Sequence, residues 1–511
     1  MVCNYMRDDI KDIRIKRLKK NTFSPLIFRV LNIVLGIILP RVYLQYYGSS
    51  INGLINSITQ FLNFISILEL GMGAIVESAL YKPLANKEND KISSIVVSAK
   101  KFYRSLAKIL VIYVVLLIFI FPSVVNNKYD IFYTGFLIIA ISIGLFANYY
   151  FGIVNTLLLN ADQRGYVQYN IQIIMVVVNF IVSVFMISHG FDIQMVKLTT
   201  GFIYLMRPIY LYFYVRKNYL INWKIYYDVE PLEQKWNGIA QHVANLVLEN
   251  TDIILLTFFS TLSTISVYSI YSMIVSSIER LFSALTNGVL ALWGELWVKG
   301  EKALLIFQFK KLEWIVHNLV IFIYGCTGML IVPFVKVYTH GINDVNYDVP
   351  IFAVVITSAY LARCIQRPYT TLCFAANKYS ETQNCYLITA IINIIISVIA
   401  VNSYGLIGVA IGTFCAMTYQ MIWMLIYSYK KLLQIPIKGC IKLFVEDIFI
   451  ILVATMICLN IRMQSITYIS WIILAIRVAF VWGCIILITN VVLYKKYIIW
   501  VINKILRKKN G

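Results

Sequence analysis

One stretch of the chain, residues 109–125, reads ILVIYVVLLIFIFPSVV and contains no charged residue. With its flanks it is long enough to cross a hydrocarbon core of about 30 Å as a helix that rises ~1.5 Å per residue. Comparable runs recur along the 511 residues, of which 60% are hydrophobic and 14% are charged. Globular domains carry roughly 25% charged residues. We therefore predict an all-α, polytopic membrane protein.

About fourteen transmembrane helices are expected. Their positions are about 25–47, 51–80, 102–125, 131–159, 166–188, 195–215, 237–259, 264–293, 313–335, 350–375, 385–402, 405–427, 446–463 and 468–493. The predicted domains are a basic amphipathic amino-terminal segment (1–24), a first six-helix bundle (25–215), a linker (216–236), a second six-helix bundle (237–427), an extra two-helix unit (428–493) and a basic tail (494–511).

The basic residues predict the orientation of these helices. Of 45 Lys and Arg residues, 34 lie at or beside the amino end, the even-numbered gaps and the tail, whereas four belong to the opposite side and seven lie inside spans. By the positive-inside rule, both termini are expected in the cytoplasm, as in a multi-pass protein of the bacterial inner membrane. The net charge of +21 therefore indicates topology, and nucleic acid is not an expected partner.

An internal repeat is expected at a shift of 214 residues. The shift superposes Thr156 on Thr370, Asn179 on Asn393 and nine identical residues among 29 positions from 156 to 184. It also places Ser49–Ile51 on residues 263–265. Six spans per repeat insert both halves in the same direction, so we predict two bundles related by a pseudo-twofold axis along the membrane normal, with a substrate path between them.

Charged residues inside the spans are candidates for function, because each is costly in lipid unless it has water, a partner or a ligand. Arginine can hold phosphate oxygens in a bidentate manner, and a carboxylate nearby can take up a proton. The candidate substrate-binding residues are Arg29, Arg41, Arg280, Arg363 and Arg367, and the candidate ion-coupling residues are Glu69, Glu249 and Asp252. The alternative is that fixed Arg–Glu pairs connect the helices. Arg363 and Arg367 are four residues apart and repel unless an anion or acid lies between them.

Enzymatic chemistry is not expected. The nine cysteines form no CxxC pair, and the chain contains neither HExxH nor GxxxxGK[ST]. We predict no catalytic residue, no metal and no cofactor. The longest predicted outward loop, about residues 336–349, is short for an enzyme that polymerises or ligates sugars.

Residues 68–73 read LELGMG, residues 80–85 read LYKPLA, and residues 405–412 read GLIGVAIG. With the span count, the repeat and the basic tail, these segments resemble Wzx-type polysaccharide and O-antigen flippases of the multidrug/oligosaccharidyl-lipid/polysaccharide exporter superfamily. The resemblance implies flipping of an undecaprenyl-diphosphate-linked oligosaccharide for O-antigen (lipopolysaccharide), capsule or exopolysaccharide. It implies alternating access and ion coupling, with membrane lipids, a polymerase and a chain-length regulator as partners. Arginines near the start of each half, here Arg29, Arg41 and Arg280, would hold the diphosphate.

Two transporters of other cargo fit the same pattern. A cation-coupled multidrug exporter of this superfamily would use acids such as Glu69, Glu249 and Asp252. A lipid II flippase also has fourteen helices. A non-transporting scaffold or a sugar polymerase fits the short loops and the repeat less well.

Overall fold

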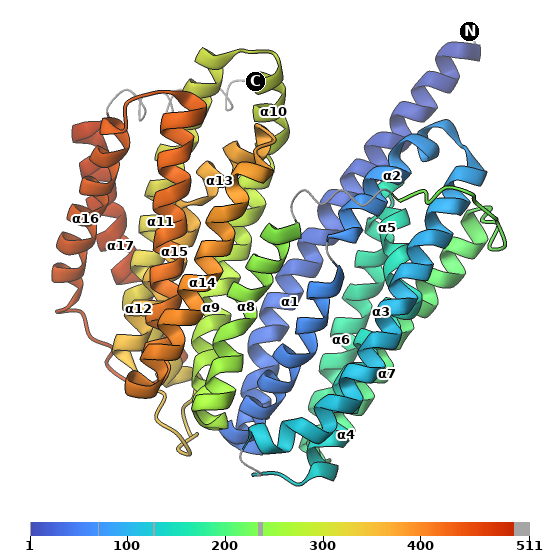
Figure 1. Ribbon diagram of the computed structural model, residues 1–511. Helices are drawn as coiled ribbons and strands as arrows, with labels where there is room; N and C mark the ends of the chain where they lie inside the picture. Colours follow the sequence, from blue (N-terminus) through green and yellow to red (C-terminus); the bar gives the residue numbers. More distant parts are fainter. Residues whose placement is uncertain (1, 70, 126–127, 233–238, 495–511) are drawn as a thin grey trace. The chain divides into compact units, whose positions relative to one another are not determined.

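The computed structural model describes residues 2–69, 71–125, 128–232 and 239–494 (Figure 1). All regular elements of this part of the chain are helices, three of them short 3₁₀ or π segments. In chain order they are α1 (Val2–Asn63), η1 (Phe64–Glu69), α2 (Met72–Asn86), α3 (Asn89–Val124), α4 (Ile131–Ala147), η2 (Asn148–Gly152), α5 (Ile153–Ala161), α6 (Tyr166–Ser188), α7 (Ile193–Asn218), α8 (Ile239–Phe259), α9 (Leu262–Asn287), α10 (Leu290–Val298), α11 (Lys302–Tyr338), α12 (Pro350–Ile365), α13 (Arg367–Ala375), α14 (Tyr379–Tyr404), α15 (Leu406–Tyr427), η3 (Ser428–Leu433), α16 (Lys438–Cys458) and α17 (Tyr468–Leu493).

The fourteen predicted spans coincide with helical stretches of the structure, which confirms the all-α fold. Some spans are interrupted: the second consists of the end of α1, η1 and α2, and the tenth consists of α12 and α13. By length and apolar composition alone, eight stretches of the described residues qualify as membrane spans. Helices such as α8, α9 and α12 are not among these eight. They carry the charged and polar residues discussed below.

The first predicted span and the beginning of the second both lie in α1, which is bent at Gly48. This glycine has φ 78° and ψ 175°, a combination that side chains with a Cβ disfavour. Five residues later, Gly53 lies directly against the backbone of Leu262, and a Cβ there would be 1.7 Å from the Leu262 carbonyl oxygen. A glycine is therefore required at both positions, one for the turn and the other for close packing.

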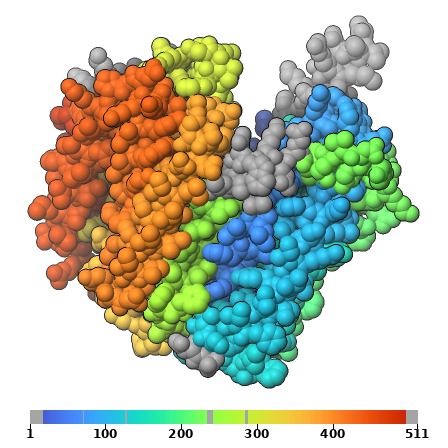
Figure 2. Space-filling model, in the orientation of Figure 1, coloured from blue at the N-terminus to red at the C-terminus, as the bar shows by residue number. Residues whose placement is uncertain are grey.

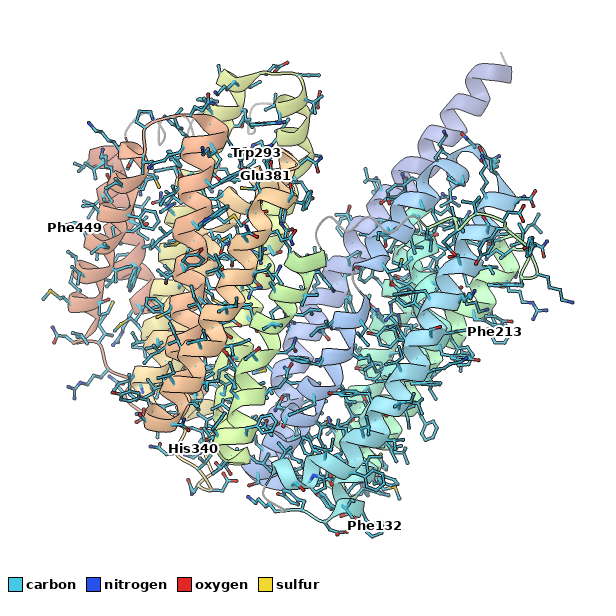
Figure 3. All side chains as sticks on the ribbon, in the orientation of Figure 1. Phe132, Phe213, Trp293, His340, Glu381 and Phe449 are labelled. Carbon is cyan, nitrogen blue, oxygen red and sulfur yellow. The ribbon has the colours of Figure 1, made fainter. Side chains whose placement is uncertain are left out.

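The chain forms two compact units. The first holds residues 1–246 and 261–266, and the second holds residues 247–260 and 267–511. In the first unit α1 packs against α6 and α4 packs against α7; in the second, α15 packs against both α12 and α14. Large apolar side chains are exposed at the periphery of each unit, for example Phe213 and Phe449 (Figure 3). Such a surface suits contact with lipid.

The helix bounds follow the 214-residue shift. Moving α5 by 214 positions gives residues 367–375, which are the bounds of α13, and α3 moves to within one residue of α11. The left-handed residues that follow α5 and α13, Gln163 and Asn377, share a φ of 55° and are also 214 positions apart. The backbone thus repeats even where the side chains differ.

Two further helices, α16 and α17, pack on α11 in the second unit. The indole of Trp482 fills the space over Gly325, where a Cβ would be 2.1 Å from the ring. Ile450, Ala454, Leu474 and Val478 belong to the same buried cluster. The predicted extra helix pair is therefore joined to its bundle by a packed apolar interface.

Candidate functional site

The second unit contains a cluster of charged residues from four helices. Arg363, on α12, donates from Nη2 to Glu249 Oε1 on α8 at 2.6 Å. Its Nε lies 3.8 Å from Glu279 Oε1 on α9. Arg367, at the start of α13, forms an ion pair with the same oxygen of Glu279. Three of the residues selected from the sequence, Glu249, Arg363 and Arg367, are thus brought together.

Glu279 resolves the repulsion expected between the two arginines. Arg363 and Arg367 are one turn apart, and like charges at this spacing destabilise a helix. The Glu279 carboxylate contacts both guanidinium groups. For these two arginines the structure therefore shows the fixed Arg–Glu pairs that the sequence left as an alternative.

The cluster has a buried and an exposed end. The side chain of Glu279 is 9% exposed and that of Arg363 is 13% exposed, whereas the side chain of Glu249 is 52% exposed. Arg280 follows Glu279 on α9 and is exposed. Arg280 forms no ion pair with the described residues. At its exposed end, the cluster therefore offers the Arg363 guanidinium, whose partner Glu249 is accessible.

Asp252 lies in a separate buried site one turn from Glu249 on α8. Its Oδ2 accepts hydrogen bonds from Tyr268 Oη and Thr413 Oγ1, both at 2.6 Å. Asn393 Nδ2 approaches its Oδ1 at 3.4 Å. These donors are neutral, so no cation among them balances an ionised Asp252. A buried carboxylate with neutral donors is suited to binding a proton or a small cation.

The other candidates lie in the first unit. Glu69, at the end of η1, accepts a hydrogen bond from Tyr149 Oη in η2 at 2.5 Å. Tyr149 in turn stacks on Tyr103, with ring centroids 6.4 Å apart. Arg29 is exposed on α1, and Arg41 is half-buried on the same helix. The predicted gathering of these residues around one cleft with those of the second unit stays a prediction.

Positions 149 and 363 correspond under the 214-residue shift, and both bear a side chain that pairs with a carboxylate. Tyr149 lies in η2, a π segment, and Arg363 lies just before the break between α12 and α13 at Gln366. Tyr149 pairs with Glu69, from the second span of its half, and Arg363 pairs with Glu249 and, at 3.8 Å, with Glu279, from the second span of its half. The same irregular point of each bundle therefore carries a polar pair.

Sequence reasoning missed a buried polar network on α11. Glu313 accepts hydrogen bonds from Tyr369 Oη at 2.8 Å and Tyr429 Oη at 2.6 Å. One turn further, His317 Nδ1 lies 2.6 Å from Asp447 Oδ2 on α16. Glu313 and Asp447 fell at the ends of predicted spans, where charges are ordinary. The signal was their spacing: Glu313 and His317 are four residues apart, which places them on one face of α11.

Within the described residues, no group of three His, Cys, Asp or Glu residues is placed to hold a metal ion. The chemistry available at the two sites of the second unit is the binding of anions by arginine and of protons or monovalent cations by carboxylates.

Neither a protein-family model nor a curated protein sequence matches the chain, but solved structures do. The lipid II flippase MurJ in an inward closed conformation is similar with a TM-score of 0.70 and 14% identity, over 94% of this chain and 99% of that chain. An inward-facing multidrug resistance MATE family transporter of the MOP superfamily is similar with a TM-score of 0.54 and 12% identity, over 77% of this chain and 93% of that chain. The bent form of the Vibrio cholerae MATE transporter VcmN is similar with a TM-score of 0.50 and 12% identity, over 82% of this chain and 97% of that chain. The chain therefore shares the polytopic all-α fold of the lipid II flippase and of these multidrug transporters.

Proposed function

We propose that the chain is a flippase for undecaprenyl-diphosphate-linked oligosaccharide units, working by alternating access in the bacterial inner membrane with both termini in the cytoplasm. The observation that carries this proposal is the extent of the structural likeness. The lipid II flippase is similar over 94% of the chain, whereas the MATE transporters are similar over 77% and 82%. The 6% left over is about 30 residues, too few to contain the whole predicted two-helix unit at 428–493. The likeness to a flippase therefore extends into the extra helices.

The charged cluster of the second unit would bind the diphosphate. A guanidinium donates two parallel hydrogen bonds to phosphate oxygens. Glu249 is the exposed partner of Arg363, so a diphosphate would take its place, while the buried Glu279 keeps both arginines in position. Arg280, exposed on the next residue of α9, would contact the same anion. Arg29 and Arg41 stay candidates for the first unit.

Asp252 is the proposed coupling residue. It is buried, it accepts hydrogen bonds from neutral donors only, and Glu249 lies one turn away on the same helix. Binding of a proton or cation at Asp252 would change the charge next to the arginine cluster. Glu69, held by Tyr149, is the corresponding candidate in the first unit.

Two other cargoes remain as alternatives. Lipid II is supported by the structural likeness to MurJ, and it also carries a diphosphate. A cationic drug is supported by the fold of the MATE transporters and by the acids Asp252, Glu249 and Glu69. The LELGMG and LYKPLA segments, with their resemblance to polysaccharide flippases, favour the oligosaccharide. A polymerase and a chain-length regulator would then act on the product.

Reconstitution into liposomes tests the proposal. Purified protein is incorporated with an undecaprenyl-diphosphate-linked oligosaccharide, with lipid II or with a cationic dye, and the transfer of each between leaflets is measured. We expect protein-dependent transfer of the oligosaccharide lipid, lost in Arg363→Ala and retained in Arg477→Ala, a control at an exposed arginine of α17. Transfer of lipid II or dye alone would replace the proposed cargo. If none of the three cargoes is transferred, even under an imposed proton or sodium gradient, the proposed flippase function is wrong.

A further inference from the structure

A pocket with two cationic side chains lies in the first unit, apart from the residues used above. A pocket of about 460 Å³ is lined by α3, η2, α5, α7 and the segment after α7. Its charged lining residues are Lys100 and Arg104, and the rest of its wall is mainly aromatic and apolar, including Tyr150, Phe213 and Trp223. Its size falls within the range of about 300–1,000 Å³ of sites for small molecules.

The two cations are held at the pocket by aromatic rings. The Lys100 ammonium lies 3.9 Å from the centroid of the Trp223 ring, and the Arg104 guanidinium lies 4.8 Å from that of Tyr150. Arg104 Nε is buried without a hydrogen-bond partner among the described residues. No carboxylate in the described ranges forms an ion pair with either side chain. Lys100 and Arg104 therefore repeat the i, i+4 arrangement of Arg363 and Arg367, but without an acid corresponding to Glu279.

Trp223 reaches the pocket because the segment after α7 is attached to α3. The backbone N–H of Asn222 donates to Ser93 Oγ at 3.0 Å, and Ser98 Oγ donates to the Glu230 carboxylate. Figure 2 shows this segment, in green, against the beginning of α3. The predicted linker is thus part of the pocket wall. Its position is fixed by hydrogen bonds on both sides of Trp223.

The position of the pocket along α3 indicates the class of ligand that would fit it. The 36 residues of α3 span about 54 Å at ~1.5 Å per residue, which exceeds a hydrocarbon core of about 30 Å. The uncharged stretch at 109–125 fills the core, so Lys100 and Arg104 lie near the level of the headgroups, on the side of the basic loops. Next to them, Phe151, Ile209 and Phe213 are 45%, 50% and 62% exposed. A ligand there meets cations at its head and an apolar surface along its tails.

We propose that this pocket binds the phosphate of an anionic glycerophospholipid of the cytoplasmic leaflet. The phosphate lies between Lys100 and Arg104 and takes a hydrogen bond from Arg104 Nε. The acyl chains lie along the exposed apolar residues of η2 and α7. Bound lipid fastens the segment 219–232 to α3, since Trp223 and Lys100 belong to both the pocket and that attachment.

Lipid titration of the full-length chain in neutral detergent tests the proposal. Phosphatidylglycerol and phosphatidylcholine are added, and lipids retained per protein are counted by native mass spectrometry. We expect the wild type to retain phosphatidylglycerol selectively. The variant Lys100→Ala/Arg104→Ala should retain one phosphatidylglycerol molecule fewer per protein. Its affinity for this lipid should be at least about tenfold lower, because charge-assisted hydrogen bonds are lost. Lys101→Ala/Lys108→Ala removes equal charge from exposed positions of α3 and should bind as the wild type does.

Several outcomes would overturn the proposal. Equal binding by the Lys100/Arg104 variant and the wild type would show that the pocket does not hold the lipid. An equal loss in the Lys101/Lys108 variant would indicate diffuse attraction to the membrane surface. Displacement of the lipid by millimolar inorganic phosphate would identify a site for small anions. If the double alanine variant does not fold, Lys100→Gln/Arg104→Gln keeps the stems that pack on the rings and should show the same loss.

Discussion

Asn52 donates a hydrogen bond from Nδ2 to Ser266 Oγ at 2.8 Å, and the two residues are 214 positions apart, the same distance as the internal repeat. Beside them, the hydroxyl oxygens of Ser50 and Ser263 are 3.1 Å apart. Two positions that correspond under the predicted shift are therefore joined by a side-chain hydrogen bond. This contact lies within the first compact unit, which includes residues 261–266.

Substitution of Asn52 by Ala should destabilise this contact. A buried hydrogen bond between helices contributes about 1 kcal/mol, and in membranes often less. We expect Asn52→Ala and Ser266→Ala each to lower the unfolding temperature in detergent. In a double-mutant cycle, the two changes together should cost less than the sum of the single changes. Strict additivity would show that the two side chains do not interact.

Glu279→Gln should be far more damaging than Glu249→Gln. The first change leaves Arg363 and Arg367 without the carboxylate that contacts both, and loss of one partner of a buried ion pair costs about 3–5 kcal/mol. The second removes an exposed partner, for which about 0–1 kcal/mol is expected. Chemical denaturation of the purified variants measures both values. Comparable losses would mean that Glu279 does not hold the two arginines in place.

Asp252→Asn should separate coupling from folding. The amide oxygen can still accept from Tyr268 and Thr413, so we expect the variant to fold with little change in unfolding temperature. The amide cannot take up a proton, so cargo transfer driven by an imposed ion gradient should disappear, while exchange without a gradient continues. Asp252→Ala, which leaves the donors unpaired, should instead be unstable. Gradient-driven transfer by Asp252→Asn at the wild-type rate would rule out Asp252 as the coupling residue.

Gly325→Ala should weaken the attachment of α17. The added Cβ would overlap the ring of Trp482, and overpacking in a filled core costs about 1–3 kcal/mol. Gly483→Ala is the matched control, because its Cβ would meet Phe322 at an ordinary 3.8 Å. We expect a lower unfolding temperature for the first variant only. Truncation of Trp482 in the Gly325→Ala background should recover part of the loss, and no recovery would place the clash elsewhere.

The fold was predictable because it depends on local features of the sequence, namely the length of apolar runs and the positions of polar residues within them. Apolar runs predicted fourteen stretches that are helical in the structure, and matching polar residues such as Asn179 and Asn393 predicted the repeat. Two sets of partners were not predictable. Spacing places Arg363 and Arg367 on one helix face, but which acid lies opposite depends on how α9 is rotated. Likewise, nothing in the sequence of the segment after α7 indicated that Trp223 covers Lys100.

Some candidate residues lie together in the structure and others do not, and this too depends on how the helices pack. Glu249, Arg363 and Arg367 came together through Glu279, in ion pairs that connect α8, α9, α12 and α13. Asp252, only one turn from Glu249, points into a different buried site, since three residues of a helix turn the side chain by about 300°. Arg29 and Arg280 are exposed, a property that depends on neighbouring helices and not on depth along their own helix.

The irregular points at η2 and at the break between α12 and α13 show how the two halves diverged. If one bundle was duplicated, both copies began with the same residue at this point. Today one copy has a phenol, Tyr149, and the other a guanidinium, Arg363, each against a carboxylate. The pair in the first half has lost or never had a fixed positive charge. The two halves thus hold chemically different polar pairs at corresponding points, so a change in protonation or ligand binding that breaks one pair need not break the other.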